Sequence, residues 1–244
     1  ASAAAARLAN TETYVDRLNA DERYASQRNS RPPAHVERRL ALFDCVTCDK
    51  CIPVCPNHAN FAFTPLDATI PRLTLRGTAG APLLDRGEPL TLERPHQLAT
   101  FADFCNQCGN CDVFCPEDGA PYAIKPVFFG SEAHWRAFAS RDGFFVTPDL
   151  VLARAGGGEY RLTRNGERTR FTGAGFDIEL QLDAPEATIR GSWNESVPLT
   201  WCYVMDLLQR SVLDTSQVNY VNLLWSGASH AASAASGDDG RPQP

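Results

Sequence analysis

Residues 45–56 read C-V-T-C-D-K-C-I-P-V-C-P, and residues 105–116 read C-N-Q-C-G-N-C-D-V-F-C-P. Each run has the spacing C-x2-C-x2-C-x3-C-P, and the two runs account for eight of the nine cysteines. Three thiolates at successive three-residue intervals share one tight loop, which can wrap three irons of a cubane while backbone N–H groups point at its sulfides. The pattern predicts two 4Fe-4S clusters, with ligands drawn from Cys45, Cys48, Cys51, Cys55, Cys105, Cys108, Cys111 and Cys115.

Three other cysteine chemistries compete with this interpretation. A zinc ion also takes four thiolates, but zinc sites usually use paired C-x2-C units, and three cysteines in succession crowd a tetrahedral ion. A secreted disulfide framework spreads its cysteines over a small scaffold, whereas here four fall within residues 45–55 and four within 105–115. A redox-active C-x-x-C would use only one pair. Two clusters fit this number and spacing of cysteines better than any of these alternatives.

The two runs resemble those of the bacterial two-cluster ferredoxin family, over residues 42–123. In that arrangement the fourth cysteine of each run reaches across to the other cluster. The resemblance implies that the first cluster is held by Cys45, Cys48, Cys51 and Cys115. It implies that the second cluster is held by Cys105, Cys108, Cys111 and Cys55.

Longer strings around the runs carry a second resemblance. Residues 43–61 and 104–122 are similar to the C-terminal iron-sulfur region of the family named "putative selenate reductase", whose members are glutamate-synthase-like flavoproteins. The similarity continues more weakly through Lys125-Pro126 into residues 143–145. In such enzymes FAD and NAD(P) sites precede the ferredoxin part. The resemblance therefore implies a flavoprotein domain or subunit, linked to NAD(P)H, as the partner.

The composition along the chain divides it into four parts. Residues 1–40 are polar and arginine-rich with weak helical patterning, and we interpret them as a lead-in or linker. Residues 41–130 hold the cysteine runs, and residues 143–225 are expected to form a small antiparallel β domain with a C-terminal helix. Residues 226–244 should form a flexible tail, because Ala, Ser, Gly and Asp bury little apolar surface. The expected fold class is α+β, with a ferredoxin-like two-cluster core that contains a hairpin insertion, followed by the β domain and a covering helix.

Strand signals are frequent in two of these parts. Strand-like pieces at residues 70–76 and 90–94 predict a hairpin inserted between the cysteine runs. In the β domain, strands are expected at 144–146, 150–154, 159–163, 169–172, 176–182 and 187–190. Asn165-Gly166 predicts a type I′ hairpin, and the apolar alternation of residues 176–182 predicts a sheet with one buried face.

An apolar stripe predicts one helix after these strands. The helix should begin near Ser196, with Pro198 in its first turn, and should cover the sheet. Cys202 lies one position off the stripe. We interpret it as a buried or half-buried thiol with no chemical role.

The charge and hydropathy of the chain limit which binding partners and which cellular compartment are expected. The formal net charge is −6 and no run of arginine resembles a nucleic-acid arm, so no nucleic-acid partner is expected. The longest apolar stretches fall short of the about 20 residues that span a bilayer, so no membrane insertion is expected. Residues 1–6 lack the cationic and long apolar regions of a secretory signal. These features predict a cytoplasmic protein.

The residues between the ligands differ between the two runs. The second loop offers the amides of Asn106, Gln107 and Asn110 as donors to cluster sulfurs, whereas the first offers Thr47 and the cation Lys50. The two reduction potentials can therefore differ, in an order that the sequence does not give. Aromatic residues near the runs are expected to exclude water from the clusters: Phe43, Phe104, Phe114, Tyr122, Phe128 and Phe129.

The sequence shows no catalytic constellation beside the cysteines. His35, His58, His96 and His134 occur singly, and Gly156-Gly157-Gly158 lies between two expected strands rather than on a nucleotide-binding turn. The function predicted is that of the electron-transfer part of an oxidoreductase, which relays single electrons between a flavin partner and a reductase site. Two alternatives stay open, a free-standing ferredoxin-type carrier and an assembly or docking module with structural clusters.

Overall fold

The computed structural model describes residues 2–25 and 40–226. They divide into two compact units, with residues 2–25 and 116–118 in one and residues 40–115 and 119–226 in the other. The expected tail at 227–244 and the second part of the expected lead-in lie outside the described residues.

The first unit consists mainly of a helix, α1 (Ala3–Ala20), followed by the 3-10 turn η1 (Glu22–Tyr24). The Ser2 hydroxyl caps α1 by accepting a hydrogen bond from the N–H of Ala5 at 3.3 Å. None of the side chains of α1 is buried among the described residues. The helix therefore rests on local propensity, which its many alanines supply.

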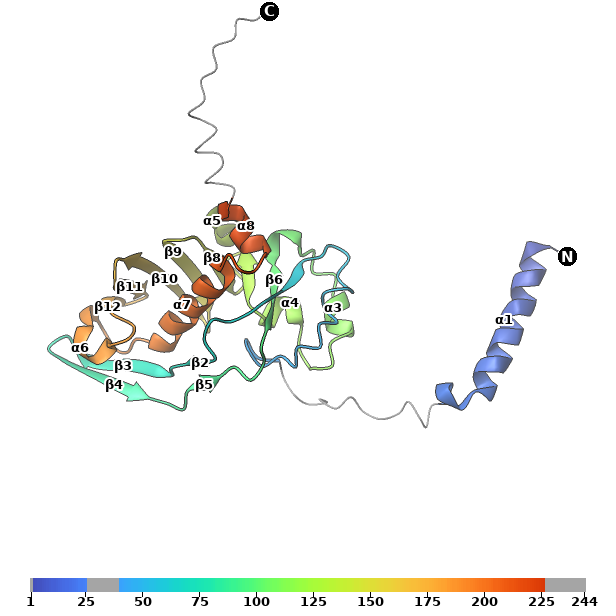
Figure 1. Ribbon diagram of the computed structural model, residues 1–244, viewed down its shortest axis with the longest axis horizontal. Coiled ribbons are helices and arrows are strands. Elements are labelled where there is room, and N and C mark those ends of the chain that lie inside the picture. Colours follow the sequence, from blue (N-terminus) through green and yellow to red (C-terminus); the bar gives the residue numbers. More distant parts are fainter. Residues whose placement is uncertain (1, 26–39, 227–244) are drawn as a thin grey trace, which may run out of the picture. The chain divides into compact units, whose positions relative to one another are not determined.

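A mixed sheet dominates the second unit (Figure 1). It has nine strands, in the spatial order β1-β6-β7-β8-β9-β10-β11-β12-β13. Its strands are β1 (Asn60–Phe63), β6 (Gln97–Phe101), β7 (Val127–Phe129), β8 (Gly143–Val146), β9 (Leu150–Ala155), β10 (Gly158–Asn165), β11 (Arg168–Gly173), β12 (Phe176–Leu180) and β13 (Arg190–Trp193). The β6–β7 and β7–β8 pairs are parallel, and the other neighbouring pairs are antiparallel. One sheet thus runs through both the cysteine-containing part and the part expected to be a β domain.

The two parallel pairs depend on crossover connections, because parallel neighbours cannot be joined by a tight turn. The connection from β6 to β7 carries the second cysteine run, with the helical turns α3 (Asn110–Val113) and α4 (Pro121–Ile124). The connection from β7 to β8 carries α5 (Glu132–Ala137). All three residues of β7 are buried, as expected for a strand with neighbours on both sides.

The expected hairpin insertion between the cysteine runs is present, with a different second strand. β3 (Leu73–Thr78) pairs with β4 (Ala81–Arg86) through the two-residue turn Ala79-Gly80. The segment predicted at 90–94 contributes only the short β5 (Leu90–Thr91), which pairs with β2 (Thr69–Ile70). The tight turn returns the chain earlier than the apolar pattern indicated.

The antiparallel meander from β8 to β13 follows the predicted strands closely up to β12. Phe176, Ile178 and Leu180 are its buried positions, which confirms the predicted one-sided burial of this strand. The predicted hairpin joins β10 to β11, but Asn165 pairs with Arg168, so the turn residues are Gly166 and Glu167. Of these two only Gly166 has a positive φ, of 60°, and a type I′ turn needs a positive φ at both positions.

The strand predicted at residues 187–190 is wrong in its placement. Pro185 instead begins a helical turn, α6 (Pro185–Thr188), and the strand β13 follows at Arg190. Proline fits the first position of a helix because that position needs no N–H donor. The strand prediction was based on the apolar pattern at 187–190 and did not take account of this preference of Pro185.

The covering helix is α7 (Leu199–Leu213), which packs against β2, β3, β9 and β10, and a short helix, α8 (Tyr220–Ser226), follows it. Val204, Met205 and Leu208 are buried in the main hydrophobic core, as the apolar stripe predicted. Cys202 is fully buried, and burial raises the pKa of its thiol. Within the described ranges, no helix is both long and apolar enough to cross a membrane.

Candidate metal centre

Strand pairing brings the two cysteine runs to the same end of the sheet. The first run ends shortly before β1, and the second begins shortly after β6. Because these strands are antiparallel neighbours, the start of β1 lies beside the end of β6, where Asn60 pairs with Thr100. The Phe101 N–H also donates to the Ala59 carbonyl at 2.7 Å. This pairing places Cys55 beside the start of the second run.

The two loops share an unusual backbone conformation. Between Cys45 and Cys51 in the first run, Thr47 and Asp49 have positive φ values of 50° and 58°. Gln107 and Gly109 occupy the corresponding positions of the second run, with φ values of 57° and 81°. Non-glycine residues rarely adopt this region, and Thr47 is β-branched, so the repetition marks a specific loop shape. Backbone turns of this kind aim successive N–H groups at an anion.

Two backbone amides already point at cysteine sulfurs. The N–H of Thr47 donates to Cys45 Sγ at 3.3 Å, and the N–H of Ala59 donates to Cys55 Sγ at 3.2 Å. Both amides thus direct a donor at a sulfur of the first run.

From the second cysteine to the fourth, burial follows the same order in the two runs, whereas the first cysteine is buried in the first run and half-buried in the second. The second cysteine of each run is exposed, the third is buried, and the fourth is half-buried. Cys45, Cys51 and Cys111 lie in one small apolar cluster with Leu40 and Leu98. The third cysteines therefore face the interior between the loops, and the second cysteines face solvent.

Electrostatic contacts link the fourth cysteine of the first run to the second run. Burial raises the pKa of Cys111, and the charges of Cys105 and Cys55 raise it further. Cys105 and Cys55 therefore both lie close enough to Cys111 for their charges to affect its thiol. Burial also raises the pKa of Cys51, to about 11, and the charges of Cys45 and Cys111 contribute to the increase.

Lys125 is a buried cation directed at the first run. Its side chain is only 4% exposed, and its Nζ donates to Cys51 Sγ at 3.5 Å. Burial acts to lower the pKa of Lys125, but the charges of Cys51 and Cys45 outweigh it and raise the pKa. Sequence reasoning singled out Lys50 instead, which is exposed. The available signal was that Lys125 is one of only two lysines in the chain.

Asn60 is a second buried polar residue that sequence reasoning missed. Its Nδ2 donates to the Cys51 carbonyl at 2.8 Å, and its Oδ1 accepts the Thr100 hydroxyl at 2.8 Å. Its side chain also donates to the Cys111 thiol, which the backbone N–H of Tyr122 reaches as well. Asn60 therefore connects β6 to both cysteine loops.

The residues present fit two iron-sulfur clusters in their chemistry and loop shape. All nine cysteines fall in the described part of the chain and are free thiols, so none is held in a disulfide. In residues 2–25 and 40–226, no three His, Cys, Asp or Glu side chains converge closely enough to hold a single metal ion. A cubane of four irons holds its four ligand sulfurs further apart than one tetrahedral ion does. The fit therefore rests on the thiols, the repeated loop shape and the inward amides.

The aromatic residues expected around the cysteines lie in different environments. Tyr122 packs against the apolar cluster of cysteines, whereas Phe128 and Phe129 belong to the other cores of the unit. Phe104 and Phe114 are 44% and 55% exposed, so they leave the second run open to solvent. The prediction that all six aromatic residues exclude water from the cysteines is therefore too broad.

Two of the histidines that occur singly in the sequence lie within hydrogen-bonding distance of carboxylates beside the loops. His96 Nε2 lies 2.8 Å from Asp49 Oδ1, and His134 Nδ1 lies 3.0 Å from Asp103 Oδ1. Each pair joins a cysteine loop or its entry to a neighbouring segment. His35 lies outside the described residues.

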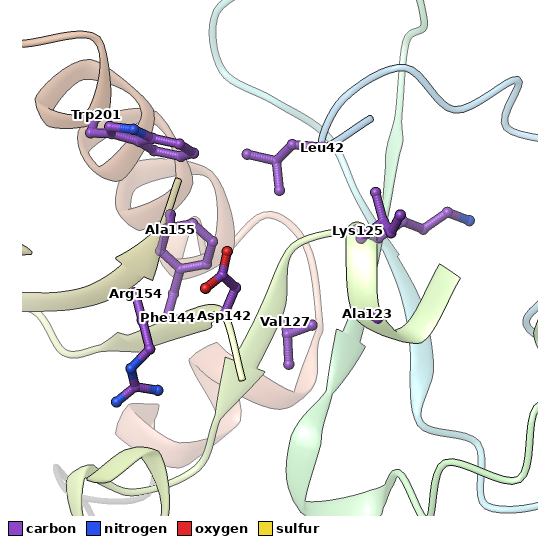
Figure 2. A pocket seen from close by; sticks show the side chains of 11 residues that line it. Leu42, Ala123, Lys125, Val127, Asp142, Phe144, Arg154, Ala155 and Trp201 are labelled. Carbon is purple, nitrogen blue, oxygen red and sulfur yellow. The ribbon is translucent and has the colours of Figure 1, made fainter. Parts of the chain in front are cut away.

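A cavity of about 260 Å³ lies beside α4, whose residues Ala123 and Ile124 line it (Figure 2). Leu42, Phe144 and Trp201 line it together with Arg154, while the Lys125 side chain extends away from it. The Arg154 guanidinium is already engaged by Glu159 and by backbone carbonyls, including that of Arg141 at 2.8 Å. One wall of the cavity is therefore apolar, and the Arg154 guanidinium beside it already has hydrogen-bond partners within the protein.

Comparison with known proteins gives one partial similarity. No protein-family model matches the chain, and no solved structure matches it. The chain is similar to "Putative oxidoreductase YgfK" of Escherichia coli (strain K12), with 33% identity over 107 residues. The protein of the same name from Escherichia coli O157:H7 matches equally. The match covers 44% of this chain but 8% of each relative, so the chain corresponds to a small portion of their length.

Proposed function

We propose that the chain holds two 4Fe-4S clusters and relays single electrons between an NAD(P)H-linked flavin partner and a reductase site. The observation that carries the proposal is the repetition of one loop conformation in both cysteine runs, with left-handed residues at equivalent positions. The two loops share their cysteine spacing, and the residues between the cysteines differ. A common anionic ligand is a reason for such loops to adopt one shape.

The chain's own residues have distinct roles in this proposal. When bound, each cluster supplies a one-electron couple whose potential depends on charge, hydrogen bonding and exposure. The buried thiols of Cys51 and Cys111 hold the interior side of the two sites, and the half-buried Cys55 and Cys115 each cross to the other site. The exposed Cys48 and Cys108 leave one face of each site open to a partner.

Similarity to an oxidoreductase supports a redox-related role, since the relative is named for that class. A flavin partner is proposed because nicotinamides deliver two electrons as hydride, whereas a cluster takes one at a time. The flavin must then split the pair. The free-standing carrier and the structural module remain as outcomes of the experiments.

Metal and sulfide analysis tests the cofactor. Protein purified without oxygen should contain close to eight irons and eight acid-labile sulfides, as expected for two 4Fe-4S clusters. Cys202→Ala should leave both values unchanged, because this buried cysteine lies outside both runs. Stoichiometric zinc without sulfide would refute the proposal, and a loss of iron in Cys202→Ala would show that a ligand is wrongly assigned.

Reduction kinetics test the relay. Dithionite or a reduced flavoprotein should bleach the visible absorption of the chain under anaerobic conditions, whereas NADH or NADPH alone should not. Rapid bleaching by the nicotinamide alone would mean that the chain contains a nucleotide-linked site of its own. Well-formed clusters that resist reduction by dithionite would favour the structural module.

A further inference from the structure

We infer that Lys125 raises the reduction potential of the cluster on Cys45, Cys48, Cys51 and Cys115, so that this cluster accepts the electron from the other one. The inference rests on the proposed function, because it needs both clusters. One electron leaves the second cluster and one enters the first, no bond is formed or broken, and a reduced flavin supplies the electron at the start. Lys125 does not exchange electrons itself. Its charge acts on the cluster through the cysteine sulfurs that it contacts.

The position of Lys125 is set by the fold. The residue follows α4 and precedes β7, and the carbonyl of its neighbour Pro126 accepts the Thr100 N–H at 2.9 Å. This bond fixes the chain beside β6, and the side chain then extends away from the cavity of Figure 2. Its Nζ reaches Cys51 Sγ at 3.5 Å and also hydrogen-bonds to Cys45.

Burial makes this charge effective. A charge in the protein interior is screened much less than one in water, so its interaction with an added electron is stronger. Reduction adds one negative charge to a cluster, and a cation beside two of its ligands stabilises that reduced form more than the oxidised form. Cluster potentials respond to nearby charge and to hydrogen bonds on the sulfurs.

The second run has neutral donors at the equivalent place. The polar groups that act on the Cys111 thiol are the neutral side chain of Asn60 and the backbone N–H of Tyr122. Charge-assisted hydrogen bonds are roughly twice as strong as neutral ones. The first cluster therefore gains more from its surroundings on reduction, and the electron should move from the second run toward the first.

Lys50 offers a matched control within the same loop. It lies between Cys48 and Cys51 in sequence, carries the same charge as Lys125, and is exposed to solvent. Water and salt screen an exposed charge, so its removal should alter the potential much less.

The experiment is a redox titration of the full chain followed by electron paramagnetic resonance. In Lys125→Met, which keeps the volume but removes the charge, the oxidised-to-reduced ratio of one cluster should rise about tenfold at fixed potential, or about 59 mV for a one-electron couple. Lys125→Arg should restore most of the original potential, and Lys50→Met should give a much smaller change. Repeating the titration in a Cys108→Ser background, which alters the spectrum of the second cluster, identifies the cluster that shifts.

The outcomes separate this inference from the proposed function. Two clusters whose potentials are unchanged in Lys125→Met, or a shift confined to the second cluster, overturn the inference and leave the relay standing. A chain without iron or sulfide overturns the relay itself. If the Lys125→Met protein fails to assemble the first cluster, the titration is done on Lys125→Gln instead. The oxidised-to-reduced ratio of the first cluster must then rise in that variant.

Discussion

The cysteine runs at residues 45–55 and 105–115 have the same loop but different neighbours. Both place left-handed residues at the two equivalent positions, and both bury the third cysteine while exposing the second. Around them the structure differs, because the buried ammonium of Lys125 reaches a cysteine sulfur of the first loop, whereas the neutral Asn60 side chain acts on a cysteine sulfur of the second. The shared loop shape thus accompanies the shared cysteine spacing, whereas the electrostatic setting follows from the tertiary fold.

The largest effect should come from breaking the crossing between the runs. In Cys115→Ala the 4Fe-4S signal of the cluster on Cys45, Cys48 and Cys51 should disappear, and the iron content should fall by about half, because each cluster holds four irons. The second cluster should keep its signal. Resonance spectra and iron analysis of the anaerobic protein measure both.

The mirror substitution is the control for this prediction. Cys55→Ala should remove the second cluster and spare the first, since crossed ligation makes Cys55 a ligand of the second cluster. If each substitution damaged only the cluster of its own run, ligation would be local and the two runs would be independent sites.

A smaller effect should come from Asn60, which connects the runs. Asn60→Ala leaves the buried Cys51 carbonyl and the Thr100 hydroxyl without this partner, which should lower the free energy of unfolding by about 2 kcal/mol. Denaturant unfolding of the metal-loaded chain measures the loss. Thr100→Val removes only one of the two bonds and should cost less. An Asn60→Ala protein as stable as the parent would show that these bonds contribute nothing net.

The smallest effect should come from the loop backbone. Gly109→Ala should cost about 1 kcal/mol, because a residue with a Cβ is disfavoured at a φ of 81°. Space is not the reason, since nothing lies within 4 Å of the added Cβ. Gly80→Ala is the matched control, with equally open space and no positive φ, and should change stability by less than about 0.5 kcal/mol. Equal losses in the two variants would contradict the explanation.

Much of the secondary structure could be read from local patterns. The strands of the meander are visible as apolar alternation, and Asn165-Gly166 marks a hairpin whose turn differs by one residue. Local pattern failed where a specific backbone preference acted, as at Pro185, which begins a helical turn within an apolar stretch.

The surroundings of the candidate site could not be read in this way. Lys125 is 74 positions from Cys51 in the chain, and Asn60 reaches Thr100 across a strand pair. Both contacts depend on which strands become neighbours. Lysine and asparagine are usually exposed, so the residue type does not predict that either one is buried. The candidate ligands could be named from the sequence because their spacing along the chain is itself the constraint. That these cysteines bind clusters, and that the two clusters are crossed, are both predictions.

The sheet order has a consequence for how the chain folds. From β8 to β13 each strand pairs with the next one in sequence, whereas β1, β6 and β7 join through longer connections. Short loops close at a smaller entropic cost than long ones, so local pairs form sooner. We therefore expect the meander to fold early and to offer the edge of β8 as a template for β7, then β6 and β1. The cysteine loops would come together last, so iron would reach a chain whose sheet is already largely in place.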